Sequence, residues 1–266
     1  MGRAMSDLGL VALQARYSLV ALFRTPRAVI FGVVFPPLLV VIFNSIFASG
    51  SGPEVTHFAG TTLDNESYFT AGIMAYAITL SSFSTLAIAL TSQRESGQLK
   101  RYRGTPVPAW TFIAALVLRS IALSCLTVTA TYAAGAAYGA SISGEGVVGL
   151  VVYAVLGTAT MCALGIALTA LTTTAETAAA IAPFSAVLLS FISGVFIPID
   201  QLSSTLADIG RIFPLAHLAE GLQLSFAATS GTGLDAGDVA SLALWALAAV
   251  VVAARRFRWE PQAARG

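Results

Sequence analysis

Residues 68–103 read YFTAGIMAYAITLSSFSTLAIALTSQRESGQLKRYR, an apolar run that ends abruptly in a basic cluster. No charged side chain occurs between Tyr68 and Ser92, and about 20 mostly apolar residues are enough for a helix to cross a bilayer. Lysine and arginine accumulate in loops on the cytoplasmic side of a membrane. The stretch therefore predicts a membrane-spanning helix followed by a cytoplasmic loop.

The composition of the whole chain agrees with this local pattern. Of its 266 residues, 56% are hydrophobic and 10% are charged, and the mean hydropathy is +0.82. Soluble domains carry about 25% charged residues, so this chain has too few charges to cover a surface that faces water. We expect an all-α integral membrane protein in the cell membrane, with lipid as the solvent for most of its surface.

Six apolar segments are long enough to span a membrane as helices. They are approximately Arg27–Ala48, Tyr68–Ser92, Ala109–Tyr138, Val147–Thr173, Ala175–Ile199 and Val239–Ala254. With six spans and both termini in the cytoplasm, the basic clusters before the first span, in loop 93–108 and in tail 255–266 all fall on one side. The loops 50–67 and 140–146 contain no lysine or arginine, as expected on the outer side. A transmembrane domain is thus predicted over residues 27–254.

The N-terminal stretch 1–26 is predicted to be a cytoplasmic amphipathic helix. Apolar residues recur at helical spacing at Leu8, Val11, Ala12, Ala15, Leu19, Leu22 and Phe23, with Asp7, Gln14 and Ser18 opposite. Such a helix lies in the membrane interface. The alternative is a simple extension of the first span, but the proline in Thr25-Pro26 favours a break. Because no small-residue cleavage site follows, we expect no cleaved signal peptide.

Arg119 lies within the third apolar segment, where a charge is costly. One interpretation begins the span near Arg119, lays Pro108–Leu118 along the cytoplasmic surface and lets the guanidinium reach the headgroups. The other is a buried functional arginine. The first interpretation is preferred because the segment is too long for one crossing.

Several kinds of chemistry have no residues to support them. A P-loop needs a Gly-Lys pair, yet the single lysine, Lys100, follows Leu99. The two histidines are far apart, Cys125 and Cys162 lie in apolar runs, and no catalytic set is present. We expect no catalytic residue, no metal site, no bound cofactor and no nucleic-acid partner. A secondary transporter or channel stays the alternative, although few carboxylates lie inside the spans.

The loop from Arg94 to Pro106 is best suited to receive energy from another protein. Leu99 and Tyr102 are three residues apart and therefore share one face of a short helix, which could enter a groove on a partner. The alternative is a solvated basic loop that touches anionic lipid. The residues themselves leave both open.

At this loop the chain resembles the membrane subunits of type-2 ABC exporters, which export drugs, lipids and polysaccharides. The matching residues are Arg94-Glu95, Gly97, Lys100-Arg101 and Thr105-Pro106, and a second match runs from Ser193 through Pro198, Gln201-Leu202 and Phe213-Pro214 to His217. Ser203 departs from the family, which often has proline there. The antibiotic-resistance branch, with its daunorubicin-type exporters, is the most similar.

The resemblance implies a half-transporter for efflux, as in multidrug resistance. Two permease chains would form a dimer, and two ABC ATP-binding subunits would bind ATP and magnesium. The coupling residues would be Arg94, Glu95, Gly97, Leu99, Lys100, Arg101, Tyr102 and Arg103. Between spans five and six, residues 200–230 would form a re-entrant helical hairpin at the outer surface. Its notable residues, with the preceding Pro198, are Asp208, Arg211, Pro214, His217 and Glu220, and Arg211 is expected to pair with Asp208.

Overall fold

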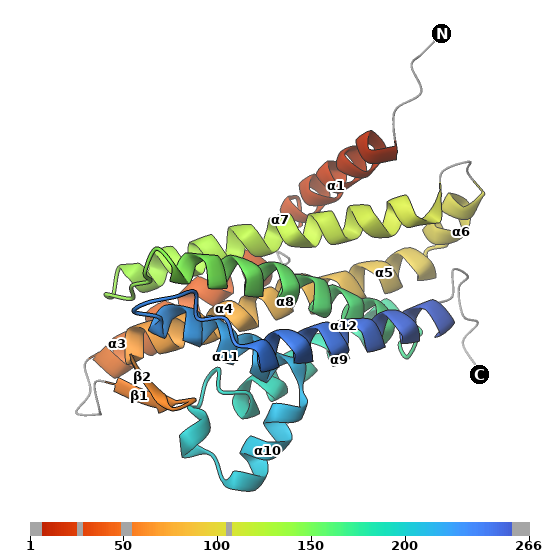
Figure 1. Ribbon diagram of the computed structural model, residues 1–266. Coiled ribbons are helices and arrows are strands. Elements are labelled where there is room, and N and C mark those ends of the chain that lie inside the picture. Colours follow the sequence, from red (N-terminus) through yellow and green to blue (C-terminus); the bar gives the residue numbers. More distant parts are fainter. Residues whose placement is uncertain (1–6, 26–28, 49–54, 105–107, 257–266) are drawn as a thin grey trace.

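The computed structural model describes residues 7–25, 29–48, 55–104 and 108–256, which form a bundle of long helices lying side by side (Figure 1). In these residues five helices are long and apolar enough to cross a membrane. They are the continuous α4–η2–α5 helix (Asn65–Thr79, Leu80–Ser84 and Thr85–Glu95), α7 (Ala109–Ala136), α8 (Gly146–Leu168), α9 (Ala175–Ile192) and α12 (Ala236–Arg256). Each corresponds to one predicted segment.

The first predicted segment, Arg27–Ala48, is helical over η1 (Ile30–Val34) and α3 (Phe35–Ala48). Its apolar helix, Gly32–Ile46, is shorter than the other five, so a sixth crossing stays a prediction. Pro36 and Pro37 lie in the first turn of α3, directly after the π-helical turn η1, in which Phe35 N–H donates to the Ile30 carbonyl. A wide turn here accommodates prolines, which lack the N–H group that an α-helix needs.

The helix α4 forms the centre of the bundle, because every residue from Ser67 to Thr79 is buried. It packs against α3, α7, α8 and α11 (Pro214–Ala227). Small residues permit this closeness: a Cβ added to Gly135 of α7 would lie 2.2 Å from Thr70 Oγ1, and one added to Gly72 would lie 3.0 Å from the Val195 carbonyl. The small-residue contact of Gly135 is therefore made within one chain.

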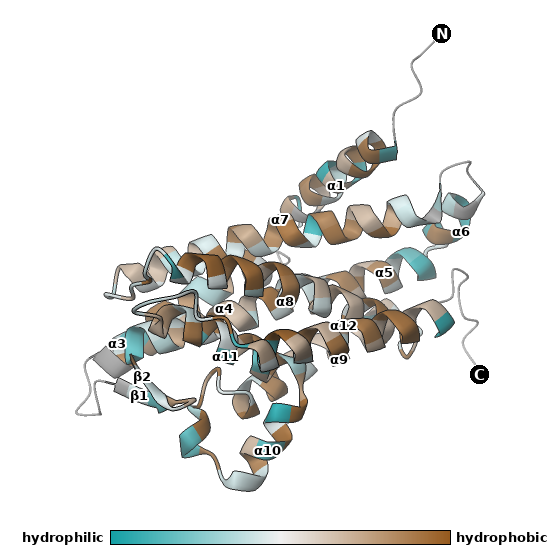
Figure 2. Ribbon diagram, viewed as in Figure 1, coloured by the Kyte–Doolittle hydropathy of each residue, from teal (hydrophilic) through white to brown (hydrophobic). Residues whose placement is uncertain are grey.

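The two ends of the bundle differ in character. The short helix α6 (Gln98–Arg103), the end of α5 and the end of α12 are hydrophilic and lie at one end (Figure 2). The opposite end holds the α7–α8 and α11–α12 loops, which meet where Gly231 N–H donates to Glu145. The described basic residues of loop 93–108 and of the end of α12 thus lie at the same end of the bundle. Which end faces the cytoplasm stays a prediction, and tail residues 257–266 lie outside the described part.

A short antiparallel hairpin, β1 (Val55–Phe58) and β2 (Thr61–Asp64), precedes α4 and was not expected from the sequence. Val55 pairs with Asp64 and Phe58 with Thr61. The turn residues Ala59 and Gly60 have φ values of 45° and 74°, a left-handed pair that suits a tight hairpin. Thr56 Oγ1 donates to Asn65 Oδ1 at 2.7 Å and fastens the hairpin to α4.

The N-terminal helix α1 (Asp7–Phe23) lies across α7 (Figure 1). Val11 and Ala15 are buried against Ala115 of α7, whereas Leu8 and Phe23, assigned to the same apolar face, are exposed. Gln14, assigned to the polar face, is partly buried and donates from Nε2 to Tyr102 Oη at 3.2 Å. The division of this helix into an apolar and a polar face therefore stays a prediction. A position in the membrane interface stays a prediction, and residues 1–6 and Pro26 lie outside the described part.

The structure corrects the preferred interpretation of Arg119. Because α7 is one continuous helix of 28 residues, Pro108–Leu118 is not a separate surface segment. The Arg119 side chain is only 5% exposed and lies on the helix face that also buries Leu116 and Leu123. It is enclosed by the bundle and cannot extend to lipid headgroups.

Candidate coupling interface

Gly97 creates the sharp turn between α5 and α6. Its φ of 72° lies in the left-handed region, which glycine occupies without the steric cost that a side chain brings. Its N–H donates to the Arg94 carbonyl at 3.0 Å, and its carbonyl accepts from Arg101 N–H at 3.2 Å. Gly97 thus ends one helix and begins the next.

Replacing Gly97 by alanine is expected to lower the free energy of unfolding by about 1 kcal/mol. A Cβ at Gly97 would meet no atom within 4 Å, so the loss comes from backbone conformation alone. Gly104, with a φ of −80°, is the matched control, and Gly104→Ala should leave the stability nearly unchanged. Unfolding by sodium dodecyl sulfate in mixed micelles measures both, and equal losses would contradict the explanation.

One face of α6 packs against the helix bundle. Leu99 is 1% exposed and packs in a cluster whose other buried members are Leu86, Leu90, Leu116 and Cys162. Tyr102 Oη lies 2.8 Å from Thr111 Oγ1 and accepts from Gln14 Nε2 at 3.2 Å. Tyr102 also packs its ring 5.0 Å from that of Phe112. These contacts tie α6 to α1, α5 and α7.

The prediction that Leu99 and Tyr102 share a face is confirmed, but the idea that this face enters a groove on a partner is wrong. Leu99 lies in a groove of its own chain. The neighbouring apolar helices are close enough to bury it, so no second protein is needed. The opposite face of α6 carries Lys100 and Arg101, both exposed. The side chain of Arg103 and residues Thr105 and Pro106 lie outside the described part.

The side chains of Arg94 and Glu95 form hydrogen bonds to the turn between α8 and α9. The Arg94 side chain is 1% exposed, and its Nη1 donates to the Thr169 carbonyl at 2.6 Å while Nη2 donates to the Thr172 carbonyl. Thr169 directly follows the last residue of α8, so a cation caps the negative end of that helix.

Glu95 acts on the other side of the same turn. Its Oε2 accepts from the N–H of Ala175, the first residue of α9, at 2.8 Å. A carboxylate at the positive end of a helix is favourable. The adjacent Arg94-Glu95 pair therefore links the α5–α6 corner to the end of one long helix and the start of the next.

These partners were not foreseen from the sequence. Thr169, Thr172 and Ala175 take part through backbone groups, which leave no trace in residue type, and they lie more than 70 residues away. Gln14 and Thr111, the partners of Tyr102, carried only the weak signal of polar residues within apolar helices.

The predicted outer segment forms η3 (Ile199–Gln201), α10 (Ser204–Ile212) and the largely buried α11. Buried Pro198 precedes η3, and Pro214 begins α11, where proline loses no hydrogen bond. Two successive helices, α10 and α11, are thus present, while a re-entrant hairpin at the outer surface stays a prediction. Among the described side chains, the expected ion pair between Asp208 and Arg211 is not formed. Both side chains are exposed, where water screens the attraction and ordering the two side chains costs entropy.

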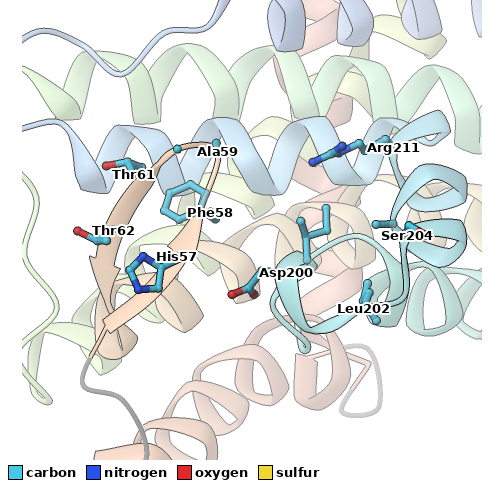
Figure 3. Close-up of a pocket in the computed structure, with 12 residues that line it drawn as sticks. His57, Phe58, Ala59, Thr61, Thr62, Asp200, Leu202, Ser204 and Arg211 are labelled. Carbon is cyan, nitrogen blue, oxygen red and sulfur yellow. The ribbon is translucent and has the colours of Figure 1, made fainter.

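A surface pocket of about 580 Å³ lies between the β-hairpin and the η3–α10 segment (Figure 3). His57 and Thr62 come from the hairpin, and Asp200, Ser204 and Arg211 come from the facing segment. The pocket is open, and its charged side chains are exposed.

His217 joins α11 to α10 and α12. Its Nδ1 lies 2.8 Å from Asp238 Oδ1, and its Nε2 lies 2.9 Å from the Arg211 carbonyl oxygen. Because an ionised carboxylate and a carbonyl both only accept, both nitrogens donate when the imidazole is protonated. The hydrogen bond to Asp238 is the main cause that raises the pKa of His217, against opposition from burial. Burial also raises the pKa of nearby Glu220.

The raised pKa makes this contact pH-dependent. The contact contributes about 1 kcal/mol to the free energy of unfolding. This contribution is fully present below the pKa of His217 in the unfolded chain, about 6.5, and it is lost as the pH rises through the higher pKa of His217 in the folded chain. Stability measured from pH 5 to 9 should therefore fall more steeply in the wild type than in His217→Gln. Glu220, Arg211 and Asp238 remain in both chains. His57→Gln, at an exposed position of β1, should behave as wild type, and a profile unchanged by His217→Gln would contradict the assignment.

Comparison with known proteins assigns the family. A model for the family described as ABC-2 type transporter matches residues 10–226, most of the chain. No curated protein matches the chain. The family consists of multi-pass permease components that lack an ATPase domain and work with an ABC ATP-binding subunit. With its long apolar helices and its α6 corner, the chain belongs to the ABC-2 type transporter membrane family.

Proposed function

We propose that this chain is the permease of an ATP-driven exporter that moves a hydrophobic or amphipathic substrate outward across the cell membrane. The main observation behind this proposal is how α6 is attached to the rest of the chain. The inner face of α6 contacts α1, α5 and α7, its outer face presents Lys100 and Arg101, and Arg94 and Glu95 beside it bind the α8–α9 turn. A push on α6 would thus reach the long helices through these contacts.

The remaining parts of the complex follow from this role. Two ATP-binding subunits bind ATP and Mg²⁺ and dock at α6, which places this end and both termini in the cytoplasm. Two permease chains, identical or homologous, enclose the pathway. The basic outer face of α6 suits a partner groove with acidic side chains, because complementary charges speed association and fix the register.

Purification of the tagged chain from its native membrane in a neutral detergent tests the proposal. We expect a P-loop ATPase to co-purify, and we expect vesicles that contain the complex to accumulate substrate only with ATP and Mg²⁺. A chain that purifies alone and moves solute without ATP would instead be a secondary transporter or channel.

A further inference from the structure

Arg119 is a buried cation without a counter-charge. It lies ten residues after the first residue of α7, which corresponds to about 15 Å along the helix at about 1.5 Å per residue. Its Nε and Nη2 are fully enclosed and have no hydrogen-bond partner in the described structure. No described carboxylate is within ion-pair distance of it. A guanidinium is not placed in such surroundings without cost, so a missing partner is the natural explanation.

The groups around Arg119 are small and polar, and they come from three helices. The Ser120 hydroxyl, next in the chain, is buried and faces the Cys162 thiol of α8. The Cys162 thiol of α8 lies beside Arg119 and Ser82 of η2. Ser124 of α7 contacts the Ser82 hydroxyl at 3.0 Å. Of the side chains that the structure describes, the polar groups nearest the cation are thus the Cys162 thiol and the Ser120 hydroxyl, and none is an acid.

This combination has the chemistry of an anion receptor. A guanidinium binds phosphate or carboxylate through two parallel hydrogen bonds, and serine hydroxyls can donate to further oxygens. A π-helical turn such as η2 is frequent at functional sites because it displaces the backbone from the regular helix. Both unpaired guanidinium nitrogens are fully enclosed in this structure, so an anion must part the surrounding side chains to reach them. Once bound, it would satisfy both nitrogens and remove the cost of the isolated charge.

We propose that Arg119 and Ser120, with Ser82 and Cys162 facing them, form a binding site for a phosphate or carboxylate group inside the helix bundle. The anion is carried by an amphiphile that enters from the membrane, or it is a free ion. Only the claim that the bound molecule is cargo rests on the proposed function; the site itself is a property of this chain.

Binding to the full chain in dodecyl maltoside tests the site without any ATPase. The probes are dodecyl phosphate, dodecyltrimethylammonium with the same tail and opposite charge, and inorganic phosphate. We expect dodecyl phosphate to bind wild type, Arg119→Gln to weaken it about 10- to 100-fold, and the cationic probe to show no such dependence. Arg16→Gln, at an exposed position of α1, should change the affinity less than about twofold. Comparable Arg119-dependent binding of inorganic phosphate would assign a free anion as ligand, whereas much weaker binding of it would assign the amphiphile.

A second measurement applies even if Arg119→Gln does not fold. Cys162 is buried beside the site and Cys125 is exposed, so a Cys125→Ser chain reports alkylation of Cys162 alone. Dodecyl phosphate should slow this alkylation, and dodecyltrimethylammonium should not. Equal affinity of wild type and Arg119→Gln, or equal protection by both probes, would overturn the proposal. Because neither readout uses ATP, failure here leaves the exporter function intact, and absence of an ATPase partner leaves the anion site intact.

Discussion

Replacing Arg94 by leucine is expected to lower the free energy of unfolding by about 2–4 kcal/mol, because charged hydrogen bonds contribute about 1.5–3 kcal/mol each. The Thr169 and Thr172 carbonyls lose their donors, and the end of α8 loses the cation that compensates its dipole. Unfolding in mixed micelles gives the magnitude.

The effect should depend on the capping role and not on charge in general. Arg94→Lys keeps the charge but loses the planar guanidinium that reaches two carbonyls. The free energy of unfolding of Arg94→Lys should therefore lie between those of the wild type and Arg94→Leu. Arg101→Leu is the control, because Arg101 is exposed on the neighbouring helix and should retain wild-type stability. A loss below about 0.5 kcal/mol in Arg94→Leu would mean that water replaces the guanidinium, as at ordinary surface positions.

The double variant Lys100→Glu with Arg101→Glu is expected to weaken binding of the ATP-binding subunit at least about 100-fold. Both side chains are exposed on the outer face of α6, so reversal of their charge places two repulsive groups in the contact without disturbing the fold. The affinity of the purified permease for the ATPase subunit, measured at two salt concentrations, gives the result, and the defect should shrink as salt screens the repulsion.

Two further arginines provide a matched control for this experiment. Arg255 and Arg256 are exposed at the end of α12, at the same end of the bundle. Arg255→Glu with Arg256→Glu makes the same charge change there and should retain most of the affinity. Equal loss in both double variants would show that general electrostatic attraction, and not docking on α6, holds the complex together.

The long helices were predictable because lipid imposes a simple rule on sequence. Within a bilayer every backbone group must bond internally, so a long apolar run has few alternatives to a helix. The predicted segments beginning at Tyr68, Ala109, Val147, Ala175 and Val239 all became helices, with ends displaced by several residues at most. The common face of Leu99 and Tyr102 also followed from the local helical spacing.

Contacts between distant segments were not predictable in the same way. The partners of Arg94 are carbonyls on another helix, and no residue type signals them. For Arg119, the expectation weighed the cost of a buried charge correctly but could not foresee that α7 continues without a break and turns the side chain inward. Leu99 illustrates the same limit, because an apolar residue on a loop fits a partner's groove and the chain's own groove equally well.

Site-directed photo-crosslinking tests the central claim most directly. In a chain carrying Cys125→Ser and Cys162→Ala, a thiol-reactive photo-crosslinker is attached at Arg101→Cys on α6 or at Thr62→Cys on the exposed side of β2, and the complex is irradiated in its native membrane. We expect the α6 position to crosslink to the ATP-binding subunit and the β2 position to give no such product. A crosslink from β2, or none from α6 while the ATPase co-purifies, would contradict the assignment of α6 as the coupling helix.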